Sequence, residues 1–190
     1  MTNNNWIQTY TGKCFTPLDP KPEDICAEDI AHHLSNLCRF SGAVNDFYSV
    51  AEHSVRCFWY AREVLSPGPP SPLHLAVLLH DAAEAYIIDL PRPIKMHEDL
   101  RLYREAEERI HEAVRQAFNI PLCTWRSQVI SLADNTILAT EKRDLMGPSP
   151  KPWIALPAPQ KEVIIPWAPK KAEGYFMYNF NRTMEAIQGG

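Results

Sequence analysis

Residues His80 and Asp81 are the strongest candidates for chemistry in this 190-residue chain, because they place two metal-binding side chains next to each other in the stretch LLHDAAEAYIIDLPRPIK. Consecutive residues of a helix face different directions, so they share one ion only if it lies near the helix surface and other elements complete its coordination shell. His53 in SVAEHSV and Asp134 in SLADNTI are suitable partners. Two imidazoles and two carboxylates suit a borderline divalent ion that keeps positions free for water and substrate. The sequence therefore predicts one divalent ion (Mn, Co, Zn or Mg) bound by His53, His80, Asp81 and Asp134.

Each of these residues has a simpler explanation when it is considered alone. A single histidine in an apolar helix is usually packed or capping, and a single aspartate on a helix is even less informative. The joint pattern changes the balance, because a buried carboxylate needs a cation or hydrogen-bond donors, and AVLLHDAAEAY places Asp81 inside an apolar stretch. One ion compensates all of these groups together, which favours the metal site.

Glu84 and Asp89 are the candidate catalytic residues. Glu84 follows His80 by four residues, so both side chains project from one face of the same helix. From there Glu84 reaches a metal-coordinated water without being a ligand, as a general acid or base must. Asp89 could protonate or hydrogen-bond a departing oxygen. The alternatives are a solvent-exposed helix residue for Glu84 and a cap of the turn before Leu90-Pro91 for Asp89.

Arg39, Phe40 and Lys95 are candidate substrate-binding residues. The guanidinium of Arg39 fits phosphate in a planar, bidentate geometry, and Phe40 beside it could pack against a sugar or base. Lys95 follows the Pro-Arg-Pro turn and is a second, weaker phosphate candidate. Alternatively, Arg39 is a cation at a helix C-terminus, where positive charge is favoured.

The elements that must position these side chains are mostly helices, so the fold class is predicted to be mainly all-α. A short hairpin is expected at residues 6–17, around Thr11-Gly12, and the Pro-rich stretch 66–72 is expected to be an exposed connection. Residues 147–169 hold seven prolines and predict an irregular arm that wraps the domain. Apolar spacing predicts helices at about 24–40, 47–65, 72–87, 98–117, 124–145 and 169–187.

The predicted helices place the candidate residues as follows. His80 and Asp81 lie in the last two turns of the 72–87 helix, and Arg39 ends the 24–40 helix. Leu90-Pro91 begins an extended segment. His74, His97 and His111 are expected to be surface residues.

Length and composition predict one domain over residues 1–190, with a helical core at about 24–145 and the arm and terminal helix at 147–187. The net charge of −4 and pI near 6.0 argue against duplex nucleic acid as a partner. The sequence has no run of 18 apolar residues, so no membrane span is predicted. The N-terminus lacks the pattern of a secretory signal. Five scattered cysteines fit free thiols in a reducing cytoplasm.

The order His53, His80-Asp81, Asp134 resembles the metal-binding motif of the HD-domain phosphohydrolases. Within that superfamily the chain is similar to the group that contains bacterial 5′-deoxynucleotidases and phage dATP triphosphohydrolases. The resemblance covers nearly the whole chain. The matching segments are CRF with Arg39, AEHS with His53, HDAAE with His80, Asp81 and Glu84, DLP with Asp89, and AD with Asp134.

The resemblance implies an HD-domain helical bundle, a homodimer or larger homo-oligomer, and in-line attack on phosphorus by a metal-activated water. It also implies roles for the other residues: Arg39 neutralises phosphate charge, Glu84 orients or deprotonates the water, and Asp89 assists the leaving oxygen. Two positions depart from the pattern: relatives often have Gly where this chain has Ile88, and often His where it has Ala43. Both departures concern the substrate and not the metal ligands.

The expected function is hydrolysis of nucleotides, with 2′-deoxynucleoside 5′-monophosphates as the first choice of substrate. A compact contact between Phe40 and the sugar disfavours a 2′-hydroxyl, which would lose water without gaining a partner. The shortage of clustered Lys and Arg disfavours three phosphates. The alternatives are a dATP-type triphosphohydrolase and, from another class, a catalytically silent nucleotide-binding HD module. Hydrolysis of a signalling nucleotide is a further rival, but the additional paired acidic motifs of the alarmone enzymes are not found.

Overall fold

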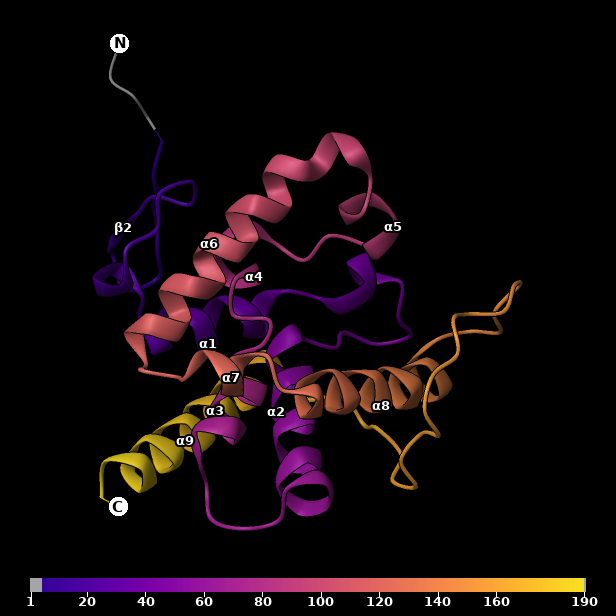
Figure 1. Cartoon of the computed structure of the whole chain (residues 1–190). Coiled ribbons are helices and arrows are strands. Elements are labelled where there is room, and N and C mark those ends of the chain that lie inside the picture. The colour runs from indigo at the N-terminus through magenta and orange to yellow at the C-terminus, as the bar shows by residue number, and fades with distance from the viewer. Residues whose placement is uncertain (1–4, 190) are drawn as a thin grey trace.

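Helix α2 (Val50–Tyr60) occupies the centre of the fold, and four other helices pack against it. The structure is a computed structural model that describes residues 5–189 (Figure 1). The helices in contact with α2 are α1 (Ala27–Asn36), α3 (Pro72–Leu78), α8 (Gln128–Leu145) and α9 (Pro169–Gln188). The main core lies between them and includes Ile30, Leu34, Val55, Leu75 and Phe176, all of which are fully buried. The predicted all-α class is confirmed.

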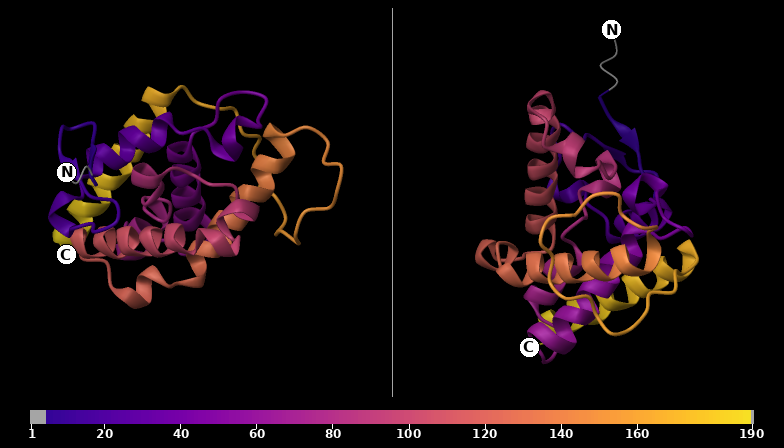
Figure 2. Two further views of the ribbon diagram at one scale, coloured as in Figure 1. Left: turned by 90° about the horizontal axis from the view of Figure 1, so that it is seen from above. Right: turned by 90° about the vertical axis from the view of Figure 1, so that its right-hand side faces the viewer.

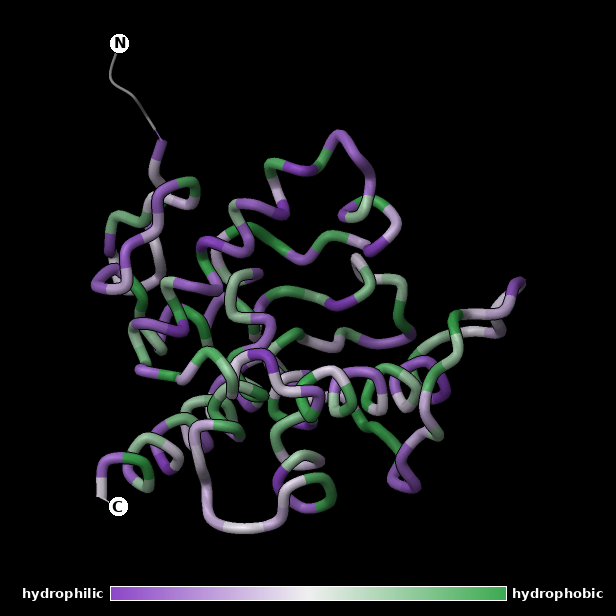
Figure 3. The backbone as a smooth tube through the Cα atoms, viewed as in Figure 1, coloured by the Kyte–Doolittle hydropathy of each residue, from purple (hydrophilic) through white to green (hydrophobic). Residues whose placement is uncertain are grey.

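The remaining elements are short, apart from α6 (Arg101–Ala117), along which hydrophilic and hydrophobic residues alternate (Figure 3). Within the described residues, no helix has the length and apolar character needed to cross a membrane. The short elements are β1 (Ile7–Gln8), β2 (Cys14–Phe15), η1 (Pro22–Asp24), η2 (Arg39–Gly42), η3 (Ala61–Leu65), α4 (Glu84–Ile87), α5 (Arg92–Lys95), η4 (Glu98–Leu100) and α7 (Leu122–Trp125).

The predicted N-terminal hairpin is confirmed: β1 and β2 pair antiparallel, and Gly12 takes a positive φ of 84° in the turn between them. Asp29 of α1 holds this turn, because its carboxylate accepts hydrogen bonds from the amide and hydroxyl of Thr11. His33 Nε2 accepts from the amide of Tyr10, so its Nδ1 carries the proton that is donated to the Ala85 carbonyl. The hairpin is thereby tied to both α1 and α4.

The predicted helix at 72–87 is interrupted, and His80 and Asp81 lie in the interruption. Helix α3 ends at Leu78, Leu79 leaves helical geometry (φ −98°, ψ 7°), and α4 begins only at Glu84. The ring of His80 bonds the Val77 carbonyl (2.8 Å), which in a continuous α-helix would accept from the amide of Asp81. The expectation that His80 and Glu84 share one helix face is therefore wrong. The turn also lets consecutive residues point toward one place, which a helix does not allow.

The first predicted helix also ends earlier than expected. Helix α1 stops at Asn36, and Leu37 and Cys38 are extended, with Cys38 bridged antiparallel to Ser49. Arg39 therefore does not end a long helix; it begins the 3₁₀ turn η2, and this bridge places it beside the start of α2. The segment after Leu90-Pro91 is likewise not extended throughout, because Arg92–Lys95 forms the single turn α5.

Residues 147–168 form the predicted irregular arm, which leaves the end of α8 and returns to the start of α9 (Figures 1 and 2). Side chains of α2 and α8 hold backbone groups of the arm by hydrogen bonds. The carboxylate of Glu52 accepts from the Trp167 amide (2.7 Å) and from Arg56, and Arg143 donates to the carbonyls of Gln160 and Glu162. These bonds fix the arm without any regular secondary structure of its own.

Candidate metal centre

The side chains of His53, His80, Asp81 and Asp134 converge at one place, although they come from α2, the α3–α4 turn and α8. His53 Nε2 lies 3.2 Å from Asp134 Oδ1, 3.3 Å from His80 Nε2 and 3.7 Å from Asp81 Oδ2. His80 Nε2 lies 3.3 Å from Asp81 Oδ2. Ligands about 2.1 Å from one ion are separated by about 3.0 Å in an octahedral and about 3.4 Å in a tetrahedral shell. These spacings are therefore those of atoms that can share an ion.

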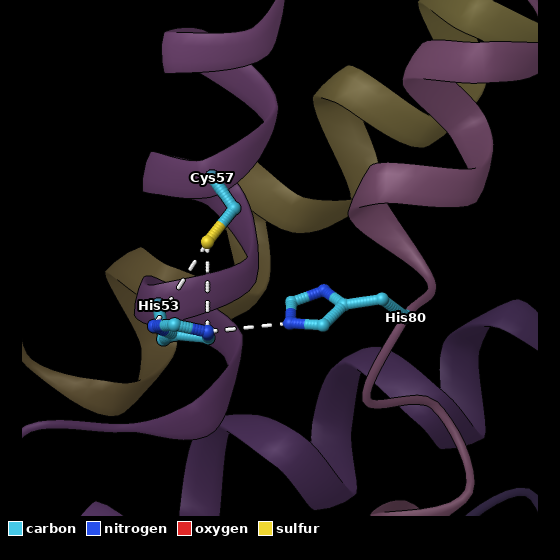
Figure 4. Close-up of side chains that lie close together, drawn as sticks. All are labelled: His53, Cys57 and His80. Atoms are coloured by element: carbon cyan, nitrogen blue, oxygen red, sulfur yellow. Dashed lines mark hydrogen bonds between the residues drawn. The ribbon is translucent and has the colours of Figure 1, made fainter. Parts of the chain in front are cut away.

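The two histidines present their Nε2 atoms to each other because their Nδ1 atoms are occupied on the far side (Figure 4). His53 Nδ1 lies 2.6 Å from Glu141 Oε1, and His80 Nδ1 lies 2.8 Å from the Val77 carbonyl. A carbonyl only accepts, so His80 Nδ1 carries the proton and its Nε2 has a free lone pair. Metal-bound histidines are commonly oriented by such carboxylate and carbonyl partners.

Charge around His53 favours a cation at its Nε2. Burial and the Arg39 guanidinium act to lower the pKa of His53, but Cys57, Glu141 and Asp134 outweigh them, and the pKa lies well above 6.5. Burial opposes ionisation of Asp134, but its hydrogen bond to His53 holds the pKa of this carboxyl below the ordinary 3.8. A metal ion would take the place of the His53 proton, because coordinating nitrogen must be deprotonated.

His53, Cys57 and His80 also form a group that could hold a metal ion, since one ligand atom of each lies within 4.8 Å of the others. Cys57 Sγ lies 3.5 Å from His53 Nε2 and 4.0 Å from its Nδ1, which places the sulfur over the face of the ring (Figure 4). Burial raises the pKa of the Cys57 thiol to about 11. The sequence analysis missed Cys57, although it follows His53 by one helical turn.

Arg39 and Glu141 form the buried back of the site. Arg39 Nη2 lies 3.2 Å from Glu141 Oε2, and Nη1 lies 3.5 Å from Asp81 Oδ2. Arg39 Nε is enclosed and has no hydrogen-bond partner among the residues that the structure describes. Burial opposes ionisation of Glu141, but Arg39 and His53 keep its pKa below the ordinary 4.5. Glu141 was not predicted, yet it follows Asp134 by seven residues, two turns along the same face of α8.

Glu84, Asp89 and Lys95 lie near the predicted ligands and influence one another by charge. Glu84 is only 7% exposed, and burial, followed by the charges of Asp81 and Asp89, raises its pKa well above 4.5. Burial also raises the pKa of Asp89. Lys95 is not free for a phosphate, because its ammonium is bonded to Glu107.

Ile88, which stands where similar sequences often have glycine, has φ 68° and ψ 152°. This backbone region is easily reached only by glycine, so a β-branched residue there is strained. Tyr103 fixes the strained turn by donating from its hydroxyl to the Ile88 carbonyl (2.6 Å). The turn sets the direction in which the chain leaves α4 toward Asp89.

Phe40 lies on the side of the site that faces the arm. The Arg39 guanidinium lies 5.2 Å from the centre of the Phe40 ring, and the ring of Trp153 lies 6.3 Å away. Phe40 and the following Ser41 both have positive φ (55° and 52°), which is uncommon for residues other than glycine. The Phe40 ring therefore makes a cation–π contact with Arg39 and an aromatic contact with Trp153.

A pocket of about 370 Å³ reaches two of the predicted ligands, His80 and Asp134. Its other walls come from the middle of α6, the end of α7 and the start of α8. His111 lines this pocket and is not the surface residue that was expected: its Nε2 is enclosed, and burial lowers its pKa to about 4. His74 is likewise buried, between Ser71 and the Ser66 carbonyl. Both corrections arise from packing between distant segments.

Comparison with known proteins identifies relatives over most of the chain. No family model matches the sequence. The uncharacterized protein YfdR of Escherichia coli is 38% identical over 184 residues, which cover 95% of this chain and 97% of YfdR. An uncharacterized protein of Rhodobacter capsulatus is 35% identical over 147 residues, which cover 75% of this chain and 74% of that protein. The chain therefore belongs to the protein family that includes YfdR.

Proposed function

We propose that the protein is a metal-dependent phosphohydrolase of the HD-domain type that acts on nucleotides. The observation that carries this proposal is the convergence of four possible metal-ligand atoms around one point: Nε2 of His53, Nε2 of His80, Oδ2 of Asp81 and Oδ1 of Asp134, with neighbouring separations of 3.2–3.7 Å. A divalent cation at this point would take the place of the His53 proton and hold the two imidazoles and the two carboxylates together.

The chemistry of the ligand set favours these four residues over a set that includes Cys57. The Cys57 sulfur lies over the His53 ring, whereas an ion on the Nε2 lone pair lies in the ring plane. The two carboxylates each approach a histidine Nε2 within 3.3 Å. Mixed nitrogen and oxygen ligands suit Mn, Co, Zn or Mg with positions left open for substrate.

A bound divalent ion would supply Lewis acidity toward a phosphoryl oxygen and lower the pKa of a water. The residues of the chain do the rest. Glu84 Oε2 is enclosed and has no hydrogen-bond partner in the described part of the chain, so it is free to hold or accept a proton. Asp89, whose pKa is also raised, is suited to hydrogen-bond a leaving oxygen.

Charge pairing favours a monophosphate over a triphosphate. Arg39 already faces Asp81 and Glu141, and Lys95 is bonded to Glu107. Arg39 and Lys95 are therefore largely neutralised, and among the described residues Arg126 is the one further arginine or lysine that lines the pocket at His80 and Asp134, which leaves little positive charge for two further phosphates. We accordingly propose 2′-deoxynucleoside 5′-monophosphates as the substrates, with deoxynucleoside triphosphates as the second choice.

The proposal is tested by measuring phosphate and triphosphate release from matched deoxy- and ribonucleotides with Mn²⁺, Co²⁺, Zn²⁺ or Mg²⁺. The expected result is release of inorganic phosphate from deoxynucleoside monophosphates, with about one metal ion per chain. Asp81→Ala should lose both the metal and the activity, and the exposed Asp99→Ala serves as the control. Release of intact triphosphate from dATP would replace the monophosphate assignment. If the protein binds metal and nucleotide but hydrolyses none of these substrates, the alternative of a catalytically silent nucleotide-binding module is favoured instead.

A further inference from the structure

The predicted ligands differ in their accessibility, and Asp81, whose side chain is 19% exposed, does not line the 370 Å³ pocket. His53 and Glu141 have no exposed side-chain area, whereas the side chain of Asp134 is 38% exposed and that of His80 is 10% exposed. His80 and Asp134 are the two that line the 370 Å³ pocket between α6, α7 and α8. A ligand that reaches the metal centre from this pocket can extend away from the metal only along the other walls of the pocket.

These walls carry groups suited to a heterocycle and a sugar, together with one arginine, Arg126. The indole of Trp125 provides an apolar face and lies 5.8 Å from the His111 ring, edge to face. Gln128 offers an amide that donates and accepts at once, the pattern that pairs with a base edge. Ser127 and Ser131 add hydroxyl groups. Asp134 is the only acidic residue of the lining, and it is one of the predicted ligands.

Two other pockets lack this connection. The pocket of about 640 Å³ lies between the end of α8 and the arm, and its lining contains none of the four predicted ligands. The pocket of about 510 Å³ contains Glu84 but none of the ligands, and its other walls are mainly apolar, with Leu37, Ile87 and Ile88. The 370 Å³ pocket is large enough to be a small-molecule site, since such sites usually begin at about 300 Å³.

We infer that the nucleoside part of the substrate lies in the pocket formed by His111, Trp125, Ser127, Gln128 and Ser131, with Trp125 covering the base and Gln128 contacting its edge. This inference rests on the proposed nucleotide hydrolysis and assigns the nucleoside to a different side of the metal centre from Phe40. Gln128 and Trp125 are then specificity-determining residues that bind substrate without taking part in the chemistry.

The test uses Gln128→Ala and Trp125→Leu in the full chain loaded with metal. Gln128 is exposed at the first position of α8, so its truncation should leave folding unchanged. Each variant should raise KM for a 2′-deoxynucleoside monophosphate about 10-fold or more, the scale of a lost polar or apolar contact to a substrate. Hydrolysis of glycerol phosphate, which has no base, should be unchanged. Binding of dAMP to the same variants in a Glu84→Gln background, measured by calorimetry, should weaken by the same factor.

The control is Trp153→Ala, which removes an aromatic ring on the Phe40 side. It should leave KM for the nucleotide unchanged. The inference is overturned if Trp153→Ala raises KM while Gln128→Ala and Trp125→Leu do not. It is also overturned if the pocket variants weaken glycerol phosphate and nucleotide equally, since they would then act on the phosphate. If the wild-type protein neither binds nor cleaves any nucleotide, the proposed function fails, and this inference fails with it.

Discussion

The inner and outer sides of the metal centre contain the same types of side chain in opposite surroundings. On the inner side, His53 and Glu141 have no exposed side-chain area, and Arg39 is 11% exposed. On the outer side, Asp81 and Asp134 are 19% and 38% exposed. Inside, the guanidinium, the carboxylate and the imidazole neutralise one another. Outside, carboxylates are in excess, and their charge is available for a ligand.

This difference separates the residues whose charges stabilise the folded protein from the residues whose charges are accessible to a ligand. A buried charge whose partners are all protein groups destabilises the protein strongly when one partner is removed. A partly exposed charge is screened by solvent, so its pairing contributes less to folding, and the charge remains accessible to a ligand. The four predictions below test this division, from the largest expected effect to the smallest.

Removal of Glu141 should have the largest effect on stability. Glu141→Ala leaves Arg39 and His53 buried without their carboxylate, so the free energy of unfolding should fall by about 3–5 kcal/mol. Asp134→Ala should lower it by less, about 1–2 kcal/mol, because the substitution removes a partner of His53 but the Asp134 side chain is 38% exposed. Both values come from denaturant unfolding with a chelator present. Similar losses in the two variants would show that the inner and outer sides do not differ.

Glu84 should affect turnover and leave metal binding intact. Glu84→Gln keeps the shape of the side chain but cannot accept or release the proton, so kcat should fall about 10²-fold, the scale of a positioned acid or base. The metal content should stay near one ion per chain. Glu98→Gln, at an exposed position of η4, is the matched control. If Glu84→Gln turns over substrate at the normal rate, Glu84 has no catalytic role and is only packed in the fold.

The same substitution should stabilise the metal-free protein at neutral pH. Burial and neighbouring carboxylates raise the pKa of Glu84 above 4.5 in the folded state, so the folded protein holds this proton after the unfolded chain has released it. Stability therefore falls as pH rises from about 4.5 through the folded-state pKa. Glu84→Gln removes this dependence: the variant should be more stable than wild type at pH 7 and equal to it at pH 4. A difference that grows toward pH 4 would contradict the direction of the shift.

Cys57 should have the smallest effect. If the four predicted residues are the ligands, Cys57→Ala should keep one metal ion per chain and destabilise the protein by about 1 kcal/mol, through the loss of a buried sulfur. Metal analysis of the purified variant measures this directly. Loss of the metal in Cys57→Ala, with retention in Asp134→Ala, would instead assign the ion to His53, Cys57 and His80.

Local sequence patterns were sufficient for most of the fold. The hairpin at Gly12, α2, α6, α8, the arm and α9 all lie where apolar spacing, glycine and proline predicted them, with shifts of a few residues at their ends. His53, His80, Asp81 and Asp134, which the sequence singled out by residue type and order, also lie close together, and their binding of a metal ion stays a prediction. The helices, the hairpin and the arm depend on residues that are neighbours in the sequence. The grouping of the four side chains was expected from residue types that one metal ion could bind together.

The interruption at residues 79–83 could not be predicted in this way, because the apolar run continues through it. The run from Leu73 to Ala83 is equally compatible with one buried helix, and the break depends on a hydrogen bond between the His80 ring and the Val77 carbonyl. That bond competes with a helix bond of similar strength, so only the surroundings of the His80 ring select it.

The sequence by itself determined which side chains are candidate ligands, the mainly helical class and the irregular arm, because residue type, periodicity and proline content are local properties. Tertiary structure decided the rest. Glu141 lies 88 residues from the His53 ring that it bonds, and His111 becomes enclosed only where α6 meets α7 and the turn after α3. Burial, pKa and access to the metal centre are set by contacts between segments far apart in the chain, and no local pattern records which segments meet.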